Sequence, residues 1–294
     1  MSTHLEICGG EAATKNTGFK EQCIESKLQI PIISDGYEFA TVSAFKTVAT
    51  WKTAQQNKHL VPLFPVYELA DASTEDTKFE SGNFSKITAK GVEKITFECY
   101  ISVCAYAALK SYENSGKYGE LFEFNEDGDY SGVFAADGVK VKGRKIKSLT
   151  VTRIRATKDK VPYVKGEITF ADKDDVLNAV IVKSDLTETD LEGIFDVELA
   201  QVGTASTTSI KFTATAGCSG GGALVTSLVA ADFVLLDPTG AADTFTLTPA
   251  DADGVYEIVG TGFTTDYTIS LDGVVAQTTI MYESPEALTV TVTP

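Results

Sequence analysis

Residues 139–170 read VKVKGRKIKSLTVTRIRATKDKVPYVKGEITF, and this stretch decides how the rest of the chain is interpreted. Charged and apolar residues alternate along it, which is the pattern of β-strands that bury one face. The alternation is interrupted once, at KDKVP (158–162), where a turn is expected. The stretch therefore predicts a long two-stranded ribbon.

The ribbon also concentrates positive charge in an acidic protein. The chain has 41 Asp and Glu residues against 25 Lys and Arg, a net charge of −16. Between residues 139 and 165 there is one acid, Asp159, and the bases are Lys140, Lys142, Arg144, Lys145, Lys147, Arg153, Arg155, Lys158, Lys160 and Lys165. Such a face complements an acidic surface of another subunit, which favours assembly over catalysis. The alternatives are a solvated strand face and a nucleic-acid contact, for which the ribbon has few aromatic residues.

The negative charge is unevenly distributed. From Phe212 to Pro294 there are ten acidic residues and no Lys or Arg. Such a break in composition marks a domain boundary, and 294 residues suffice for two domains with separate cores. We place the domains at 1–203, with 1–35 as an N-terminal arm, and at 204–294. The overall acidity argues against general nucleic-acid binding.

The second domain has the pattern of an immunoglobulin-like β-sandwich. Its sequence is rich in Thr, Gly, Ala and Val, and the turns DPTGAAD, DADG and LDGV separate short strand-like runs. Seven such runs in about ninety residues are typical of that fold. The Cys…Trp…Cys core pattern is missing, so a version without a disulfide is expected.

The first domain is expected to be mainly β with a single helix. Residues 36–51 alternate and predict one or two strands, and LQIPII (28–33) suits an edge strand. Residues 55–65 and 71–84 are rich in polar residues and breakers, which predicts loops. The Ala-rich segment Val103–Tyr112 predicts the helix.

Motifs for catalysis or metal binding are weak. His4 and His59 are the only histidines, and neither stands in a nucleophile motif. CSGGG (218–222) lacks the Lys-Ser/Thr of a phosphate loop. NEDGD (125–129) has alternating oxygen ligands but no Glu at the twelfth position of a calcium loop, so a turn is expected. We expect no catalytic residue, no metal and no cofactor.

The five cysteines form no Cys-x-x-Cys pair and are expected to be mostly reduced thiols, with a Cys8–Cys23 bridge as the alternative. The first twenty residues have no secretory signal pattern. The longest apolar run, 222–236, is too short to span a bilayer. We expect a protein that is made in the cytoplasm, stays soluble and does not insert into membranes.

The order of the elements resembles that of phage tail tube (major tail) proteins. A polar arm, strands, a long loop, one helix at Val103–Tyr112 and the basic hairpin Val139–Phe170 follow one another in residues 1–200. Residues 204–294 resemble the immunoglobulin-like domains that decorate virion proteins. In the tail tube family, a β-sandwich or barrel with one flanking helix assembles into stacked rings. Hairpins from each subunit join an inner β-barrel through which DNA passes, and one tube-like unit per chain implies hexameric rings.

The resemblance implies a structural, non-enzymatic protein of the bacteriophage tail, made in the host bacterial cytoplasm. Its partners would be copies of itself, other tail proteins, and DNA that passes through the lumen without specific binding. Tail tube proteins have no catalytic site, so no site residue is carried over. The charge pattern itself predicts a subunit interface at Lys140, Lys142, Arg144, Lys145, Lys147, Arg153 and Arg155.

Two other functions fit a two-domain β-rich chain. One is a cell-surface or carbohydrate-binding adhesion module, which would be expected to have a signal peptide and aromatic platforms. The other is a capsid decoration or head-completion protein. The single Trp of the chain lies at position 51, so the second domain has none.

Overall fold

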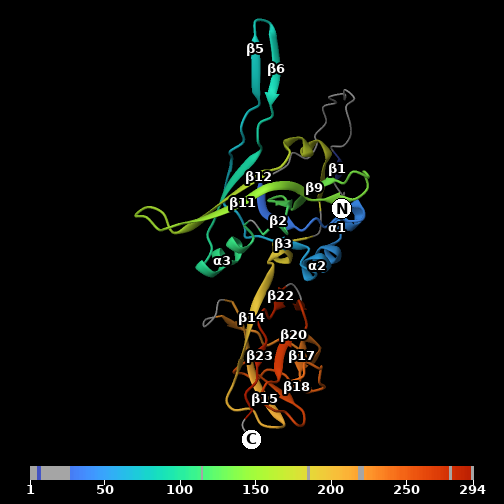
Figure 1. Cartoon of the computed structure of the whole chain (residues 1–294), viewed down its shortest axis with the longest axis vertical. Coiled ribbons are helices and arrows are strands. Elements are labelled where there is room, and N and C mark those ends of the chain that lie inside the picture. Colours follow the sequence, from blue (N-terminus) through green and yellow to red (C-terminus); the bar gives the residue numbers. More distant parts are fainter. Residues whose placement is uncertain are drawn as a thin grey trace. The chain divides into compact units, whose positions relative to one another are not determined.

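The computed structural model describes residues 5–7, 27–113, 115–183, 186–217, 222–277 and 280–292. The chain divides into two compact units, Met1–Leu191 (unit 1) and Glu192–Pro294 (unit 2). Strands dominate both units (Figure 1), so the predicted mainly β fold class is confirmed.

Unit 1 is organised around an eleven-stranded antiparallel sheet. Eight strands follow the order β1-β13-β9-β8-β11-β12-β7-β4, β2 pairs with β3 and β8, and β10 pairs with β9. A separate two-stranded sheet is formed by β5 and β6. The strands are β1 (Leu5–Ile7), β2 (Leu28–Ser34), β3 (Leu60–Pro62), β4 (Glu68–Asp71), β5 (Thr77–Ser81), β6 (Phe84–Ala89), β7 (Lys94–Cys99), β8 (Glu120–Asn125), β9 (Asp129–Phe134), β10 (Val141–Lys142), β11 (Arg144–Ile154), β12 (Tyr163–Phe170) and β13 (Ala179–Lys183). The helices are α1 (Val42–Lys46), α2 (Val48–Gln56), α3 (Val103–Ser111) and the 3-10 turns η1 (Lys173–Asn178) and η2 (Glu188–Leu191).

Strand β8 buries both of its faces. Leu121 and Phe122 are both fully buried, and successive side chains of a strand point to opposite sides. Phe122 joins an aromatic cluster with residues of α1 and α2, whereas Leu121 joins a second cluster with residues of β7, β11 and β12. The sheet of unit 1 is therefore covered by a core on each side.

Within the segment 36–51, predicted as one or two strands, residues from Val42 onward instead form helices α1 and α2, and only Phe39 makes a β-bridge, with Val141. The Thr41 hydroxyl accepts a hydrogen bond from the backbone N–H of Ala44 (3.1 Å) and caps α1. Phe45 and Trp51 are both fully buried, and the Trp51 indole N–H donates to the Phe45 carbonyl (2.6 Å). Packing of the two aromatic rings overrides the strand propensity of the Thr- and Val-rich sequence.

Three other local predictions are also wrong. Residues 71–84 are not a plain loop, because β5 and β6 form a hairpin there. LQIPII is not an edge strand, since β2 lies between β8 and β3. Its Pro31 is tolerated because it stands just before the ladder with β3, which begins at Ile32. The predicted loop 55–65 contains the end of α2 and strand β3. Of the predicted arm, residues 1–4 and 8–26 lie outside the described residues.

The predicted helix and the predicted hairpin are confirmed. Helix α3 spans Val103–Ser111, and the hydroxyl of Ser102 caps its first turn by accepting from Ala105 N–H (3.1 Å). Strands β11 and β12 pair from Ile146↔Phe170 to Ile154↔Tyr163. The hairpin is shorter than predicted, since β10 pairs with β9 instead of continuing the ribbon.

Unit 2 has the strand order of an immunoglobulin-like sandwich. One sheet runs β18-β19-β15-β14 and the other β17-β20-β23, which correspond to strands D-E-B-A and C-F-G of that fold. The β21–β22 hairpin is inserted before the last strand, and β22 pairs in parallel with β14. Residues of both sheets share one hydrophobic cluster. The strands are β14 (Ile194–Gln201), β15 (Ser209–Ala216), β16 (Ala223–Leu224), β17 (Phe233–Leu236), β18 (Thr246–Thr248), β19 (Val255–Val259), β20 (Thr268–Leu271), β21 (Val275–Gln277), β22 (Ile280–Glu283) and β23 (Leu288–Thr289), with one 3-10 turn, η3 (Ala230–Asp232).

The division between the units falls after Leu191, earlier than the predicted division after residue 203. Strand β14 pairs with β15, and its Val197 and Leu199 are buried in the unit 2 cluster. The charge break that suggested the boundary begins later in the sequence, and therefore it missed the first strand of unit 2.

Cys99 is a buried free thiol, as expected for a reduced cysteine. Cys104 on α3 is disulfide-bonded, so the expectation of a reduced thiol is wrong at that position. No helix in the described part of the chain is long and apolar enough to cross a membrane.

Candidate assembly surface

Strands β11, β12, β7 and β4 present one buried and one polar face. On β12, Val164 and Ile168 are buried, and the intervening Lys165 is exposed. A register shift between Ile146 and Ser148 marks a β-bulge on β11. The extra residue keeps Ile146 and Leu149 on the buried face although they are three positions apart. Lys145 and Lys147 flank the buried Ile146, and both are exposed on the outer side.

Arg144 is one of the seven predicted interface residues, but it is an internal structural residue. It is 8 % exposed, and its two terminal nitrogens donate to the Glu93 carboxylate at 2.8 and 2.6 Å. The guanidinium carbon lies 4.0 Å from the centroid of the Phe170 ring. A paired, stacked and buried arginine serves the core of its own chain, so Arg144 does not belong to an exposed interface.

Lys140 and Lys142 also have acidic partners in their own chain. Lys140 Nζ is 2.9 Å from a Glu38 oxygen, and Lys142 Nζ is 3.9 Å from a Glu120 oxygen. Burial raises the pKa of the Glu120 carboxyl, and the Lys142 ammonium partly opposes that rise. Part of the charge of both lysines is thus neutralised internally.

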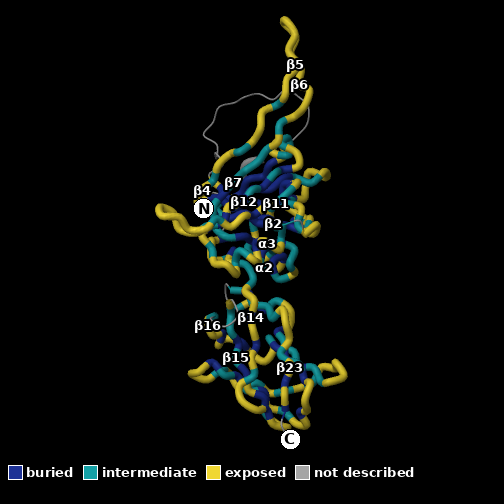
Figure 2. Tube along the Cα trace, turned by 60° about the vertical axis from the view of Figure 1, so that its left-hand side comes forward, coloured by how far each residue is buried: buried dark blue, intermediate teal, exposed yellow. Residues whose placement is uncertain are grey.

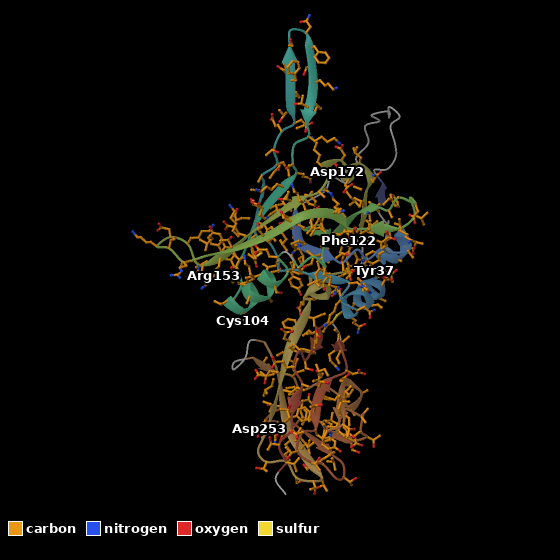
Figure 3. All side chains as sticks on the ribbon, viewed as in Figure 1. Tyr37, Cys104, Phe122, Arg153, Asp172 and Asp253 are labelled. Carbon is orange, nitrogen blue, oxygen red and sulfur yellow. The ribbon has the colours of Figure 1, made fainter. Side chains whose placement is uncertain are left out.

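The other four predicted residues are Lys145, Lys147, Arg153 and Arg155. All four are exposed, and among the described residues no hydrogen bond or ion pair reaches their side chains. Figure 3 shows Arg153 on the hairpin, where β11 leaves the body of unit 1. The seven predicted residues therefore do not form one surface, and these four are the exposed basic set.

Helix α3 covers one edge of the hairpin. Lys110 Nζ donates to the Val151 carbonyl (3.2 Å), and the Val151 N–H donates to the Glu113 carboxylate (2.9 Å). Lys110 and Glu113 are themselves ion-paired. The hydrogen bond from Lys110, followed by that from Val151, lowers the pKa of Glu113. Two side chains thus occupy the backbone groups that another strand would need for pairing.

At the opposite edge of the same four strands, the described residues provide no such cover. Strand β4 pairs with β7 on one side, and no strand of the described residues pairs with its other side. It is four residues long, and Glu68, Ala70 and Asp71 are exposed. An uncovered edge strand can accept a strand from another chain.

Three tyrosines form a row across one end of these strands, which we call the tyrosine row: Tyr67, Tyr100 and Tyr163. Tyr67 precedes β4, Tyr100 follows β7 and Tyr163 begins β12. The ring centroids of Tyr67 and Tyr100 are 5.4 Å apart, and those of Tyr100 and Tyr163 are 6.2 Å apart. Lys160 Nζ lies 4.1 Å from the Tyr163 centroid and bonds the Glu98 carboxylate at 2.6 Å. The sequence gives no signal for this row, because only the strand order brings the three residues together.

The β5–β6 hairpin projects from the body of unit 1, and every residue of both strands is exposed (Figure 2). Gly82 has φ 58° at the first central position of the connecting turn, as a type II′ turn requires. Cross-strand pairs Phe79↔Lys86 and Ser81↔Phe84 share one face, and Lys78↔Ile87 and Glu80↔Ser85 share the other. A Gly-Asn pair between two alternating runs was the sequence signal for this hairpin.

Histidine, cysteine and acidic side chains of the described residues could also supply a metal site. No group of three His, Cys, Asp or Glu side chains there is arranged to hold a metal ion. His59 bonds Asp35 (3.0 Å) and stacks on Tyr37, with 5.3 Å between ring centroids. No protein-family model, curated protein or solved structure matches this chain.

Proposed function

We propose that this chain is a structural virion protein, a subunit of a phage tail tube. Unit 1 assembles into hexameric rings that stack into a DNA conduit, and unit 2 is an outward decoration domain. The single observation that carries the proposal is the β4 edge, which no strand of the described residues covers, on a four-strand stretch whose opposite edge, along β11, is blocked by α3 at Val151.

Edge strands of monomeric proteins are normally shielded, because their free N–H and C=O groups template pairing with other chains. Here Lys110 and Glu113 bond the backbone of β11, whereas the protection of β4 is limited to its short length and to the charges of Glu68 and Asp71. A ring of subunits would remove the β4 edge by pairing it with a strand of the neighbour.

The exposed basic set supports the same function. Lys145, Lys147, Arg153 and Arg155 belong to a chain with a net charge of −16, so acidic surface is abundant on every copy. Complementary charges would orient the subunits, and a net negative lumen would let DNA pass without binding it.

Electron microscopy of the purified chain tests the proposal. We expect six-fold rings or regular tubes, and sedimentation should show species far larger than a monomer. A chain that stays monomeric at high concentration, with binding to glycans, would contradict the proposal and favour the adhesion module.

Deletion of unit 2 tests whether unit 1 alone is sufficient for assembly. The cut should be made before Glu192. A cut after residue 203 would leave β14 on unit 1 without its partner β15 and would expose Val197 and Leu199. The hydrophobic clusters of unit 1 contain no residue of unit 2, so residues 1–191 are expected to fold and assemble. Loss of all assembly after this deletion would contradict a purely decorating unit 2.

Charge reversal tests the exposed basic set. We expect Arg153→Glu to weaken assembly, and Lys211→Glu, an exposed lysine of unit 2, is the matched control. Equal assembly of the two variants would mean that the hairpin charges are only solvated.

A further inference from the structure

The β4–β7 pair and the β5–β6 hairpin form one continuous ribbon. Hydrogen bonds from Ala72 N–H to the Lys94 carbonyl (2.8 Å) and from Thr74 N–H to the Val92 carbonyl (2.9 Å) extend the β4–β7 pairing toward β5 and β6. Tyr67 and Tyr100 lie at one end of this ribbon and the turn at Gly82 at the other. At about 3.3 Å per residue the ribbon is roughly 45 Å long.

The turn end of the ribbon carries an unpartnered aromatic face. Phe79 and Phe84 are 55 % and 57 % exposed, and they share this face with Lys86. No hydrogen bond or ion pair of the described residues reaches the Lys86 ammonium. A lone two-stranded hairpin is only marginally stable in water, so a surface that covers the two rings would stabilise it.

The other end of the ribbon offers aromatic rings and negative charge. Tyr67 and Tyr100 are 56 % and 42 % exposed. Glu68 lies directly opposite Glu98, and two like charges in that position repel each other. Lys160 neutralises Glu98, but no hydrogen bond or ion pair of the described residues reaches the Glu68 carboxylate. The Glu68 carboxylate at this end could therefore pair with a cation, and Lys86 on the aromatic face of the hairpin is such a cation.

A shallow hollow of about 250 Å³ lies beside the tyrosine row, lined in part by Glu68, Thr96, Lys160 and Lys165. Sites for small molecules usually measure about 300–1,000 Å³. The hollow is thus smaller than a usual small-molecule site, and its charged lining suits polar contacts with another chain.

We propose that the β5–β6 hairpin of one copy docks on the tyrosine row of a second copy. Phe79 and Phe84 pack against Tyr67 and Tyr100, and Lys86 pairs with Glu68. The two surfaces lie at opposite ends of one ribbon, so they meet only between different copies. Such a head-to-tail contact repeats without closing and builds an open stack. The inference rests on the proposed function in one respect, that the stacked bodies are rings.

Charge exchange between the two surfaces tests the pairing in the full-length chain. Lys86→Glu and Glu68→Lys are each expected to lower the association constant about tenfold. The double variant K86E/E68K should recover most of the loss, because the pair is restored with its charges exchanged. Lys78→Glu, on the opposite face of the hairpin, is the matched control and should assemble like the wild type. A control as defective as Lys86→Glu, or a double variant that recovers nothing, would overturn the proposal.

A mixing experiment tests the direction of the contact. F79A/F84A removes the docking face and Y67A/Y100A removes the receiving surface, and each variant alone should lose stacking by about thirtyfold or more. All four side chains are at least 42 % exposed, so both variants are expected to fold. When the two variants are mixed, the hairpin of Y67A/Y100A can still dock on the tyrosine row of F79A/F84A, but no further copy can be added. Sedimentation and electron microscopy should therefore show pairs of rings and no longer stacks.

The outcomes separate the inference from the proposed function. Tubes whose length is unchanged in F79A/F84A would overturn only the docking proposal. Open filaments without rings that dissociate in F79A/F84A would support the docking and contradict the tube. A wild-type chain that remains monomeric would overturn both.

Discussion

Replacement of Arg144 by Met tests whether the most buried base of the hairpin is structural. The substitution keeps most of the aliphatic stem and removes the guanidinium that bonds both oxygens of Glu93. It leaves the Glu93 carboxylate without its bidentate partner, while 27 % of that side chain is exposed to solvent.

Removing one partner of a fully buried ion pair costs about 3–5 kcal/mol. Because Glu93 keeps part of its hydration, we expect a smaller loss of about 2–4 kcal/mol in the free energy of unfolding of unit 1. For a unit of this size a loss of 1 kcal/mol lowers Tm by about 2–4 °C, so a decrease of roughly 4–16 °C is expected. Neutralising both partners in R144M/E93Q should recover part of the loss, since the Glu93 charge is removed with its partner, and the recovery stays partial because Glu123, 3.9 Å from Arg144, remains charged.

Urea unfolding followed by tryptophan fluorescence measures this effect selectively. Trp51 is the only tryptophan of the chain and is fully buried in unit 1, so its signal reports that unit alone. Arg153→Met, at an exposed arginine of the same strand, is the control and should change stability by less than about 0.5 kcal/mol. A loss for Arg144→Met no larger than that of the control would refute the structural role.

Two further substitutions and one labelling experiment test other contacts of unit 1. Gly166→Ala would place a Cβ 2.1 Å from the ring of the buried Phe97, so unit 1 should lose about 1–3 kcal/mol or more, whereas Gly119→Ala meets no atom within 4 Å and should be neutral in the same urea assay. Glu113→Gln should destabilise unit 1 at neutral pH. The folded-state pKa of Glu113 is lowered, so the stability that its carboxylate contributes is present above its ordinary pKa of 4.5 and is lost as pH falls through the folded-state pKa. The difference between variant and wild type in the free energy of unfolding, measured at several pH values, should therefore shrink below about pH 4.5. Burial raises the pKa of Cys99 to about 12 from 9.0, so in the native chain at pH 8 mass spectrometry should find Cys99 unmodified by iodoacetamide, and rapid labelling there would contradict its burial.

The sequence predicted those parts of the fold that depend on local patterns. The alternation of 139–170 predicted the β11–β12 hairpin, although its first residues belong to β10, and the Ala-rich segment predicted α3, because short-range periodicity determines both. The regular spacing of turns likewise predicted the sandwich of unit 2. The prediction of these elements does not depend on which distant segments pack against them.

The wrong predictions concern residues whose environment is set by distant parts of the chain. Residues 36–51 alternate like strands, but Phe45 and Trp51 are held in an aromatic core with Phe122 and Tyr130, which lie far away in sequence. The boundary was placed too late because the charge break does not coincide with β14. Residues 71–84 looked like a loop because the hairpin they begin buries none of its side chains.

The candidate site was predicted only in part for the same reason. A cluster of bases in sequence does not indicate which of them are neutralised, and Arg144 meets Glu93 only because β11 and β7 belong to one sheet. The tyrosine row depends on the strand order β12-β7-β4, which no local pattern predicts. The exposed basic set and the uncovered β4 edge became distinguishable only in the folded chain.

Electron microscopy of the full-length protein over a concentration series tests the central claim most directly. If unit 1 is an assembly unit, rings with six-fold symmetry should appear and should stack into tubes of constant diameter as concentration rises. Particles that remain single two-unit chains at every concentration would contradict the account.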